Sequence, residues 1–189
     1  MIVHRFNKSE LGRYQLRKAG LKERIMAQLV DGIILGAVGG LIFFLFSQGR
    51  LYSIWVSPMF PQFILEFSTP YSPGPFDFLW GGAYFSYTLP YGKTMYFGYP
   101  APLLWIIYAI YYTYFTTRFG QTPGKMIKGL VVLTEEQSFP SPFISFKRWV
   151  GYLVSFLPLG LGFWWMEKST SKQCWHDHFT RTAVYYFED

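Results

Sequence analysis

The sequence is poor in cysteine, histidine and charge. Its 189 residues include one cysteine, Cys174, which excludes an intramolecular disulfide, and three histidines, which leave little material for a catalytic triad. Charged residues make up 15% of the chain, against about 25% in an average soluble domain. Apolar residues make up 51% and aromatic residues 22%. These proportions favour a one-domain, all-α membrane protein in which a few apolar segments are joined by polar loops.

Positive charge is concentrated at the start of the chain. Seven of the 17 lysines and arginines lie in the first 24 residues, and they lead directly into an apolar segment. Basic residues beside a membrane span favour the cytoplasmic side, partly because anionic lipid attracts them. We therefore expect a cytoplasmic N-terminus that contacts anionic lipid, and no nucleic-acid partner. No cleavable signal peptide is expected, because the apolar run is too long and no small-residue cleavage site follows it.

Residues 9–23 have the pattern of a short amphipathic helix. Leu11, Tyr14 and Leu21 would share one face, and such a helix can lie among lipid headgroups. A mobile basic arm is the equally weighted alternative. We expect residues 1–23 to form a segment distinct from a membrane domain over residues 24–187.

Two apolar segments have the length of membrane spans. Residues 25–46 would form a helix of about 33 Å, against a hydrocarbon core of about 30 Å. Asp31 is the only charge in this segment. Residues 97–117 form the second candidate, with prolines at its start, where a helix tolerates them. The first segment also carries closely spaced glycines that would let another membrane helix pack against it: Gly32, Gly36, Gly39 and Gly40.

Residues 48–98 combine many aromatic residues with repeated proline and glycine. The prolines and glycines exclude a long helix, and the aromatic content suits a membrane interface or a protein contact. We expect part of this insertion to lie on the outer membrane surface or against another membrane protein.

The third apolar segment, residues 149–166, is interrupted by Pro158, Gly160 and Gly162. A re-entrant hairpin that returns to the cytoplasmic face explains this interruption and the basic tail that follows. A third full span is the alternative. With the hairpin, the C-terminus is cytoplasmic, and the strand candidates at residues 129–134 and 182–187 can pair into a small two-stranded element.

Three motifs occur in order along the chain. Arg24 and Asp31 enter the first span; a stretch from Gly120 to Gly129 is followed by Arg148; and His176-Asp177 precedes Thr182. Together these motifs resemble the RDD family, whose name-giving Arg and two Asp fall on Arg24, Asp31 and Asp177. The supporting motif residues of this resemblance are Gly120, Pro123, Gly124, Lys125, Gly129, Arg148, His176 and Thr182. The family commonly has a small Ala-Gly pair before the last Thr, where this chain has Thr180-Arg181.

Asp31 and Arg24 are the candidate functional charges. Direct contact between them is not expected, because seven helical residues separate them by about 10.5 Å along the axis and Arg24 leans away. We expect Asp31 to meet Lys125, Arg148 or His176, and Arg24 to meet Asp177. Such pairs either fix the packing of the elements or serve ion or proton binding, and the packing role carries more weight.

The sequence suggests two site motifs that we reject, one on its spacing and one on its number of ligands. The stretch from Gly120 to Lys125 has three residues between its glycines and Met126 after the lysine, so it is no phosphate loop; Pro123 instead indicates a helix start. Cys174, His176 and His178 would share one face of a strand, but a fourth zinc ligand is not evident. We expect no metal, no cofactor and no enzymatic activity.

Two functions remain. The first is a non-catalytic accessory, assembly or regulatory subunit of a larger membrane complex; some RDD-like proteins are associated with membrane quality control. The second is a monovalent cation/proton antiporter or other small-solute transporter, with Asp31 as the ion site. The resemblance is compatible with both, although two or three spans do not easily form a transport pathway without oligomerising.

Overall fold

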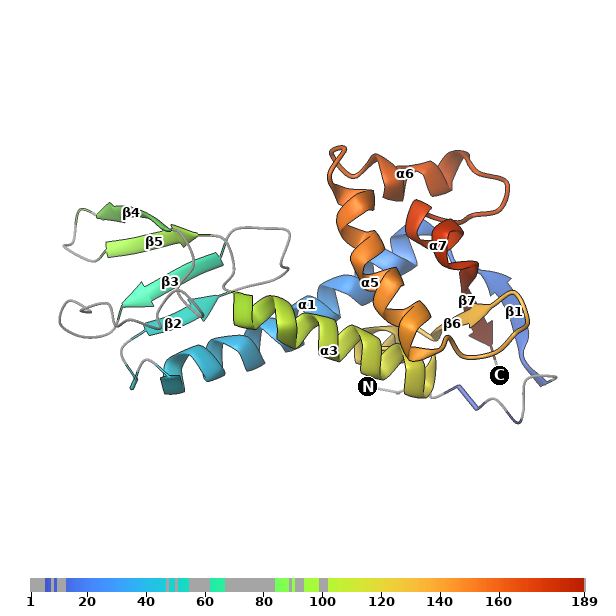
Figure 1. Cartoon of the computed structure of the whole chain (residues 1–189), viewed down its shortest axis with the longest axis horizontal. Helices are drawn as coiled ribbons and strands as arrows, with labels where there is room; N and C mark the ends of the chain where they lie inside the picture. The colour runs from blue at the N-terminus through green and yellow to red at the C-terminus, as the bar shows by residue number, and fades with distance from the viewer. Residues whose placement is uncertain are drawn as a thin grey trace. The chain divides into compact units, whose positions relative to one another are not determined.

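The fold is described from a computed structural model that covers residues 6–7, 9, 13–46, 48–49, 51–54, 62–66, 84–88, 90, 94–98 and 102–188. The chain divides into two compact units, and each is described by itself. One unit comprises Met1–Asp31 with Ala109–Asp189, and the other comprises Gly32–Tyr108. Element labels are those of Figure 1.

The first unit contains a three-stranded antiparallel sheet (Figure 1). Its order is β1 (Gln15–Lys18), β7 (Thr182–Glu188), β6 (Leu130–Thr134). β6 pairs with β7 from Leu130 opposite Tyr186 to Thr134 opposite Thr182. The predicted pairing of the two C-terminal strand candidates is therefore confirmed, with β1 added as a third strand.

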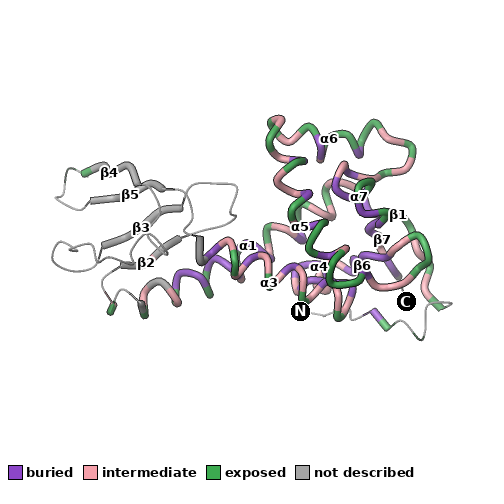
Figure 2. Tube along the Cα trace, in the orientation of Figure 1, coloured by how far each residue is buried: buried purple, intermediate pink, exposed green. Residues whose placement is uncertain are grey.

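Strand β6 is buried on both faces because its apolar run leaves no polar side to expose. On one face, Leu130 and Val132 pack with Ala27 of the first helix. On the other, Val131 and Leu133 pack with aromatic residues that include Phe6. Figure 2 shows this strand as a buried segment. The sheet thus has an apolar core on each side and fixes the positions of the helices that carry the charged motifs.

The predicted amphipathic helix over residues 9–23 is wrong. Residues 15–18 are extended in β1, which pairs with β7 from Gln15 opposite Glu188 to Lys18 opposite Tyr185. Leu16 alternates with exposed Arg17, whose guanidinium lies 4.4 Å from the centroid of the Tyr186 ring. Helical periodicity was outweighed here by strand pairing with the far end of the chain.

Two long helices follow from the two apolar segments. Helix α1 runs from Leu21 to Phe46, and its Leu21–Ile42 stretch is long and apolar enough to cross a membrane. Helix α3 spans Pro102–Phe119, but it does not meet that test over the described residues, so the expectation of two full spans is not confirmed. Tyrosine is frequent along α3 and lowers its hydropathy. The start predicted at residue 97 is also wrong, because β5 (Thr94–Gly98) includes that residue.

The third apolar segment is bent, as predicted. Helix α5 (Pro142–Phe156) and helix α6 (Leu161–Lys168) meet at 94° across a four-residue break that contains Pro158. Gly162 lies in α6 rather than in the break, and a Cβ there would come within 2.6 Å of the Ser155 Cα. The bend is that of a broken span or a re-entrant loop.

Helix α5 is amphipathic, but its apolar face points outward and its small and polar face points inward. Its buried residues are small or polar, while large apolar side chains are exposed along its outer face (Figure 2). The buried set is Ser145, Arg148, Gly151 and Ser155. The exposed set is Phe143, Phe146, Val150 and Val154, followed by Leu157 and Leu159 in the break. A helix with this distribution faces lipid or an apolar protein surface rather than water.

The second unit contains strands that the all-α prediction missed. β2 (Leu51–Ile54), β3 (Gln62–Glu66), β5 and β4 (Tyr84–Thr88) form an antiparallel sheet in that order. The fold is therefore mostly helical with two sheets, and not all-α. The expected placement of residues 48–98 against a membrane or a protein falls largely on residues outside those described.

The four closely spaced glycines of α1 have little exposed surface. All four glycines that would admit another helix are buried: Gly32, Gly36, Gly39 and Gly40.

Candidate functional site

Asp177 forms the centre of a buried ion cluster. It lies in α7 (Trp175–Thr180), a short helix that packs beside α5. Its Oδ2 accepts a hydrogen bond from Arg24 Nη1 at 2.5 Å. Its Oδ1 lies 2.6 Å from Arg148 Nη2, an ion pair without hydrogen-bond alignment. One carboxylate therefore ties the start of α1 to α5 through two guanidiniums.

The remaining groups of the cluster hold the two arginines in place. Arg148 Nη1 donates to the Thr182 hydroxyl, which in turn lies 2.9 Å from the Thr180 hydroxyl. Arg24 Nη2 donates to the Lys172 carbonyl at 3.0 Å. Because each guanidinium contacts both Asp177 and a further oxygen, the cluster fixes the relative positions of α1, α5 and the α7–β7 connection.

The electrostatics favour an ionised Asp177. Burial by itself would raise the pKa of this carboxyl, but the guanidiniums of Arg148 and Arg24 outweigh burial and hold the pKa well below its ordinary value. A permanently ionised carboxylate between two cations is unsuited to proton transfer near neutral pH. The ionised carboxylate instead links α7 to α1 and α5 through the two guanidiniums.

His176 is buried as a neutral imidazole next to this cluster. Burial lowers the pKa of His176 to about 3, a shift that Asp177 opposes and the two guanidiniums reinforce. Nδ1 lies 3.0 Å from the Ser155 hydroxyl, and the ring meets Tyr152 edge-on with centroids 4.5 Å apart. A Cβ on Gly151 would come within 2.7 Å of the His176 Cβ, so the α5 glycine is what admits the histidine.

Asp31 forms a second buried centre. Its carboxylate is inaccessible to solvent and accepts three hydrogen bonds. The donors are the Tyr111 hydroxyl at 2.8 Å, the Thr122 hydroxyl at 2.5 Å and the Gly124 backbone N–H at 2.7 Å. Asp31 thereby joins α1 to α3 and to the start of helix α4 (Pro123–Ile127).

Lys125 reaches Asp31 only through Thr122. Its ammonium donates to the Thr122 hydroxyl at 3.2 Å, and that hydroxyl donates to the carboxylate. Gly124 makes this approach sterically possible, because a Cβ there would lie 2.1 Å from the Ala27 carbonyl oxygen. The glycine of the motif therefore lets α4 rest directly on the backbone of α1.

The structure assigns the predicted partners of Arg24 and Asp31 in part differently from the sequence analysis. The predicted contact between Arg24 and Asp177 is confirmed. Arg148 and His176, expected as candidates for Asp31, belong instead to the Asp177 cluster. Lys125 is the predicted cation nearest Asp31, through an intervening hydroxyl.

Other residues of the motif have backbone roles. Gly120 and Gly129 both have positive φ angles, of 66° and 64°, which favour glycine. Their carbonyls accept hydrogen bonds from Val132 and Phe187, so both glycines attach to the sheet. Pro123 begins α4, as predicted.

Several site residues were not found from the sequence. Tyr111 and Ser155 carry no recognisable motif signal. Thr122 does, because it directly precedes Pro123 at the helix N-cap, where a hydroxyl residue is common. Thr180 belongs to the site through its hydroxyl, which contacts the Thr182 hydroxyl.

The predicted strand geometry of Cys174, His176 and His178 is wrong, because these residues lie at the start of and within α7. Ligand atoms of Cys174, His176 and Asp177 do lie within 4.8 Å of one another. Burial and the Asp177 carboxylate raise the pKa of the Cys174 thiol to about 11, so the thiol stays protonated. With two guanidiniums already on Asp177, this set does not fit a metal cation.

Arg181 occupies a position suited to glycine. It caps α7 with φ and ψ both at 48°, the left-handed conformation that often ends a helix. Its N–H still bonds back to the α7 carbonyls, so the turn is formed despite the unfavourable residue.

The model of the RDD family matches residues 18–181. This chain belongs to the RDD family. Comparison with curated proteins and with solved structures finds no match. Family membership and the apolar helix α1 together identify an RDD membrane protein. The candidate charges Asp31 and Asp177 are buried, one in each centre, and Arg24 is partly buried beside Asp177.

Proposed function

We propose that this RDD protein is a non-catalytic accessory, assembly or regulatory subunit of a larger membrane complex. The observation that carries the proposal is the state of its buried acids. Asp177 is engaged by two guanidiniums, and Asp31 by three hydrogen-bond donors. Both carboxylates join elements of the first unit. This supports a structural role, in which the fold holds surfaces for contact with other proteins, rather than a catalytic role.

The distribution of apolar surface supports membrane and protein contacts. Helix α5 exposes Phe143, Phe146, Val150 and Val154, and α6 exposes Trp164 at 64%. Exposed tryptophan suits the bilayer interface, and an outward apolar stripe suits lipid or a partner helix. Within this proposal both termini are cytoplasmic, the basic N-terminal segment contacts anionic lipid, and residues 48–98 contact another membrane protein.

Site-specific crosslinking tests the subunit role. A photoreactive phenylalanine analogue would replace Tyr52 of β2 and, as an aromatic control, exposed Phe179 of α7, in cells that make the full chain. We expect one unrelated membrane protein to crosslink through position 52 and not through position 179. Crosslinks from position 52 only to lipid or to copies of the same chain would contradict the proposal.

The second candidate function is cation/proton antiport with Asp31 as the ion site. One observation favours it: a fully buried carboxylate in the membrane-crossing helix with a buried ammonium one hydroxyl away. Cation flux in liposomes containing the purified protein tests this function. The antiporter would be favoured if Asp31→Asn abolishes the cation flux while Asp177→Asn keeps the wild-type flux per folded protein.

A further inference from the structure

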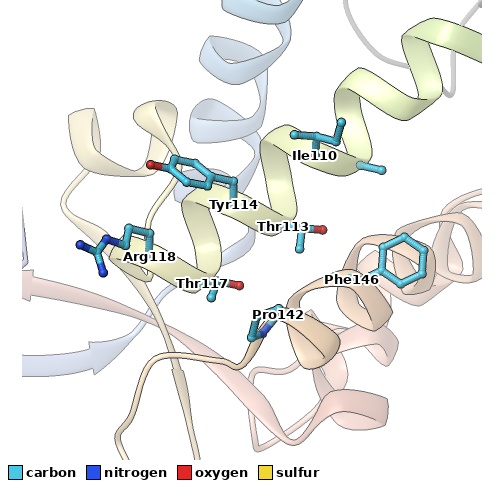
Figure 3. A pocket seen from close by; sticks show the side chains of 8 residues that line it. Ile110, Thr113, Tyr114, Thr117, Arg118, Pro142 and Phe146 are labelled. Atoms are coloured by element: carbon cyan, nitrogen blue, oxygen red, sulfur yellow. The ribbon is translucent and has the colours of Figure 1, made fainter.

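We propose that the groove between α3 and the start of α5 binds an anionic phospholipid, with the lipid phosphate at Arg118. The groove has a volume of about 480 Å³, within the range of small-ligand pockets. Its walls are formed by α3 between Ala109 and Arg118 and by Pro142 and Phe146 of α5 (Figure 3). The inference is independent of the subunit role.

The wall of the groove is suited to an acyl chain. Ile110 is 63% exposed and Phe146 is 45% exposed, and each comes from a different helix. Covering these exposed apolar side chains with a hydrocarbon chain is favourable, because it removes their apolar surface from water. An acyl chain lying along α3 contacts both walls at once.

A cation stands at one end of this apolar surface. Ile110, Tyr114 and Arg118 follow at intervals of four residues and share one face of α3. Arg118 is exposed, and its side chain makes no ion pair or hydrogen bond with any residue that the structure describes. An unpaired guanidinium at the end of an apolar stripe matches a lipid whose phosphate is negative and whose tail is apolar.

The hydroxyl of Thr113 lies along α3 between Arg118 and Ile110. The Thr113 hydroxyl oxygen is buried and has no hydrogen-bond partner within the described part of the chain. In Figure 3 it points from α3 toward the α5 side of the groove. Thr113 and Arg118 are about 7.5 Å apart along the helix axis. A phospholipid with its phosphate at Arg118 can therefore place an ester carbonyl within reach of Thr113.

Native mass spectrometry of the full chain in mild detergent tests the site. The protein is titrated with phosphatidylglycerol or with phosphatidylcholine. We expect the wild type to retain phosphatidylglycerol more tightly, and Arg118→Gln to weaken that binding about fivefold, the usual effect of one basic residue near anionic lipid. Ile110→Trp, which fills the groove, should weaken the binding of both lipids. Lys168→Gln, which removes an exposed charge from α6, is the matched control and changes neither.

Three outcomes would overturn the proposal. Equal retention of the two lipids removes the role of Arg118. Undiminished binding to Ile110→Trp places the lipid elsewhere. Equal losses in Arg118→Gln and Lys168→Gln reduce the effect to general surface charge. Because the changed side chains are exposed, the variants should fold, and Thr113→Val gives a second probe that leaves the charge and the exposed surface intact.

Discussion

Arg24 and Asp177 are 153 residues apart in the sequence and form a 2.5 Å hydrogen-bonded ion pair in the fold. The pair joins the start of the membrane helix to the last short helix of the chain. Arg148 approaches the same carboxylate from α5. Asp31 lies in a separate centre with its own hydrogen-bond donors. Arg24, Asp31 and Asp177 thus form two separate attachments rather than one charge triad.

A double-mutant cycle tests this separation. Asp177→Asn should lower the free energy of unfolding by about 3–5 kcal/mol, because the buried guanidinium of Arg148 and the partly buried one of Arg24 lose their counter-ion. Arg24→Gln combined with Asp177→Asn should show a coupling of about 0.5–3 kcal/mol. Arg24→Gln combined with Asp31→Asn should be additive, measured by thermal unfolding in detergent. Additivity in the first pair, or coupling of the same size in the second, would contradict two separate centres.

Stability should fall as pH is lowered from 7 to 5, through His176. Its folded-state pKa, about 3, is below the unfolded value, so acid protonates the unfolded chain first and favours unfolding. One such histidine accounts for about 2 kcal/mol over this range. Asp177, whose folded-state pKa is depressed, contributes fully above its unfolded pKa of about 4 and loses that contribution only at lower pH.

The variant His176→Gln isolates this effect. It should flatten the dependence of the melting temperature on pH between 7 and 5, even where it lowers the melting temperature itself. His178→Gln, at an exposed position of the same helix, serves as the control and should keep the wild-type slope. A wild-type slope in His176→Gln would assign the pH dependence to other groups.

Arg181→Gly should stabilise the protein by about 1 kcal/mol. The left-handed backbone at this helix end disfavours a side chain by about 1–2 kcal/mol, and the greater freedom of glycine in the unfolded chain offsets part of the gain. Arg181→Ala removes the same side chain without relieving the backbone and should give no gain. Equal melting temperatures for the two variants would mean that the turn carries no strain.

The bend between α5 and α6 should return the chain to the side from which it came. Single cysteines at Glu135, in the turn before α5, and at Lys168, at the end of α6, report on the two sides of the segment in a Cys174→Ala background. An impermeant maleimide should label both positions from the cytoplasmic face of oriented vesicles. Labelling of position 168 from the opposite face would make the segment a full span and contradict the proposed cytoplasmic C-terminus.

Local patterns predicted those elements whose signals are local. The apolar run gave α1, Pro123 gave the start of α4, and the break at Pro158 gave the bend, because each depends on residues close in sequence. Strand β1 was missed because it exists only through pairing with β7, more than 160 residues away. The strands in residues 48–98 were missed because their prolines and glycines indicated only the absence of a helix.

The candidate site was predictable in membership but not in pairing. Motif order identified Arg24, Asp31, Asp177 and Arg148, yet Arg148 was assigned to the wrong carboxylate. Which acid an arginine meets depends on how α5 and α7 pack, and spacing along the chain does not encode that packing. The Thr122 bridge between Lys125 and Asp31 likewise emerges only when α4 rests on α1.

The mass of the native particle tests the central claim most directly. The full chain is extracted from its own membrane in mild detergent, purified and weighed intact by native mass spectrometry. A subunit role predicts a mass that contains this chain and at least one unrelated membrane protein in a fixed ratio. A mass equal to one copy or to a simple multiple of this chain, with no other polypeptide, would contradict it.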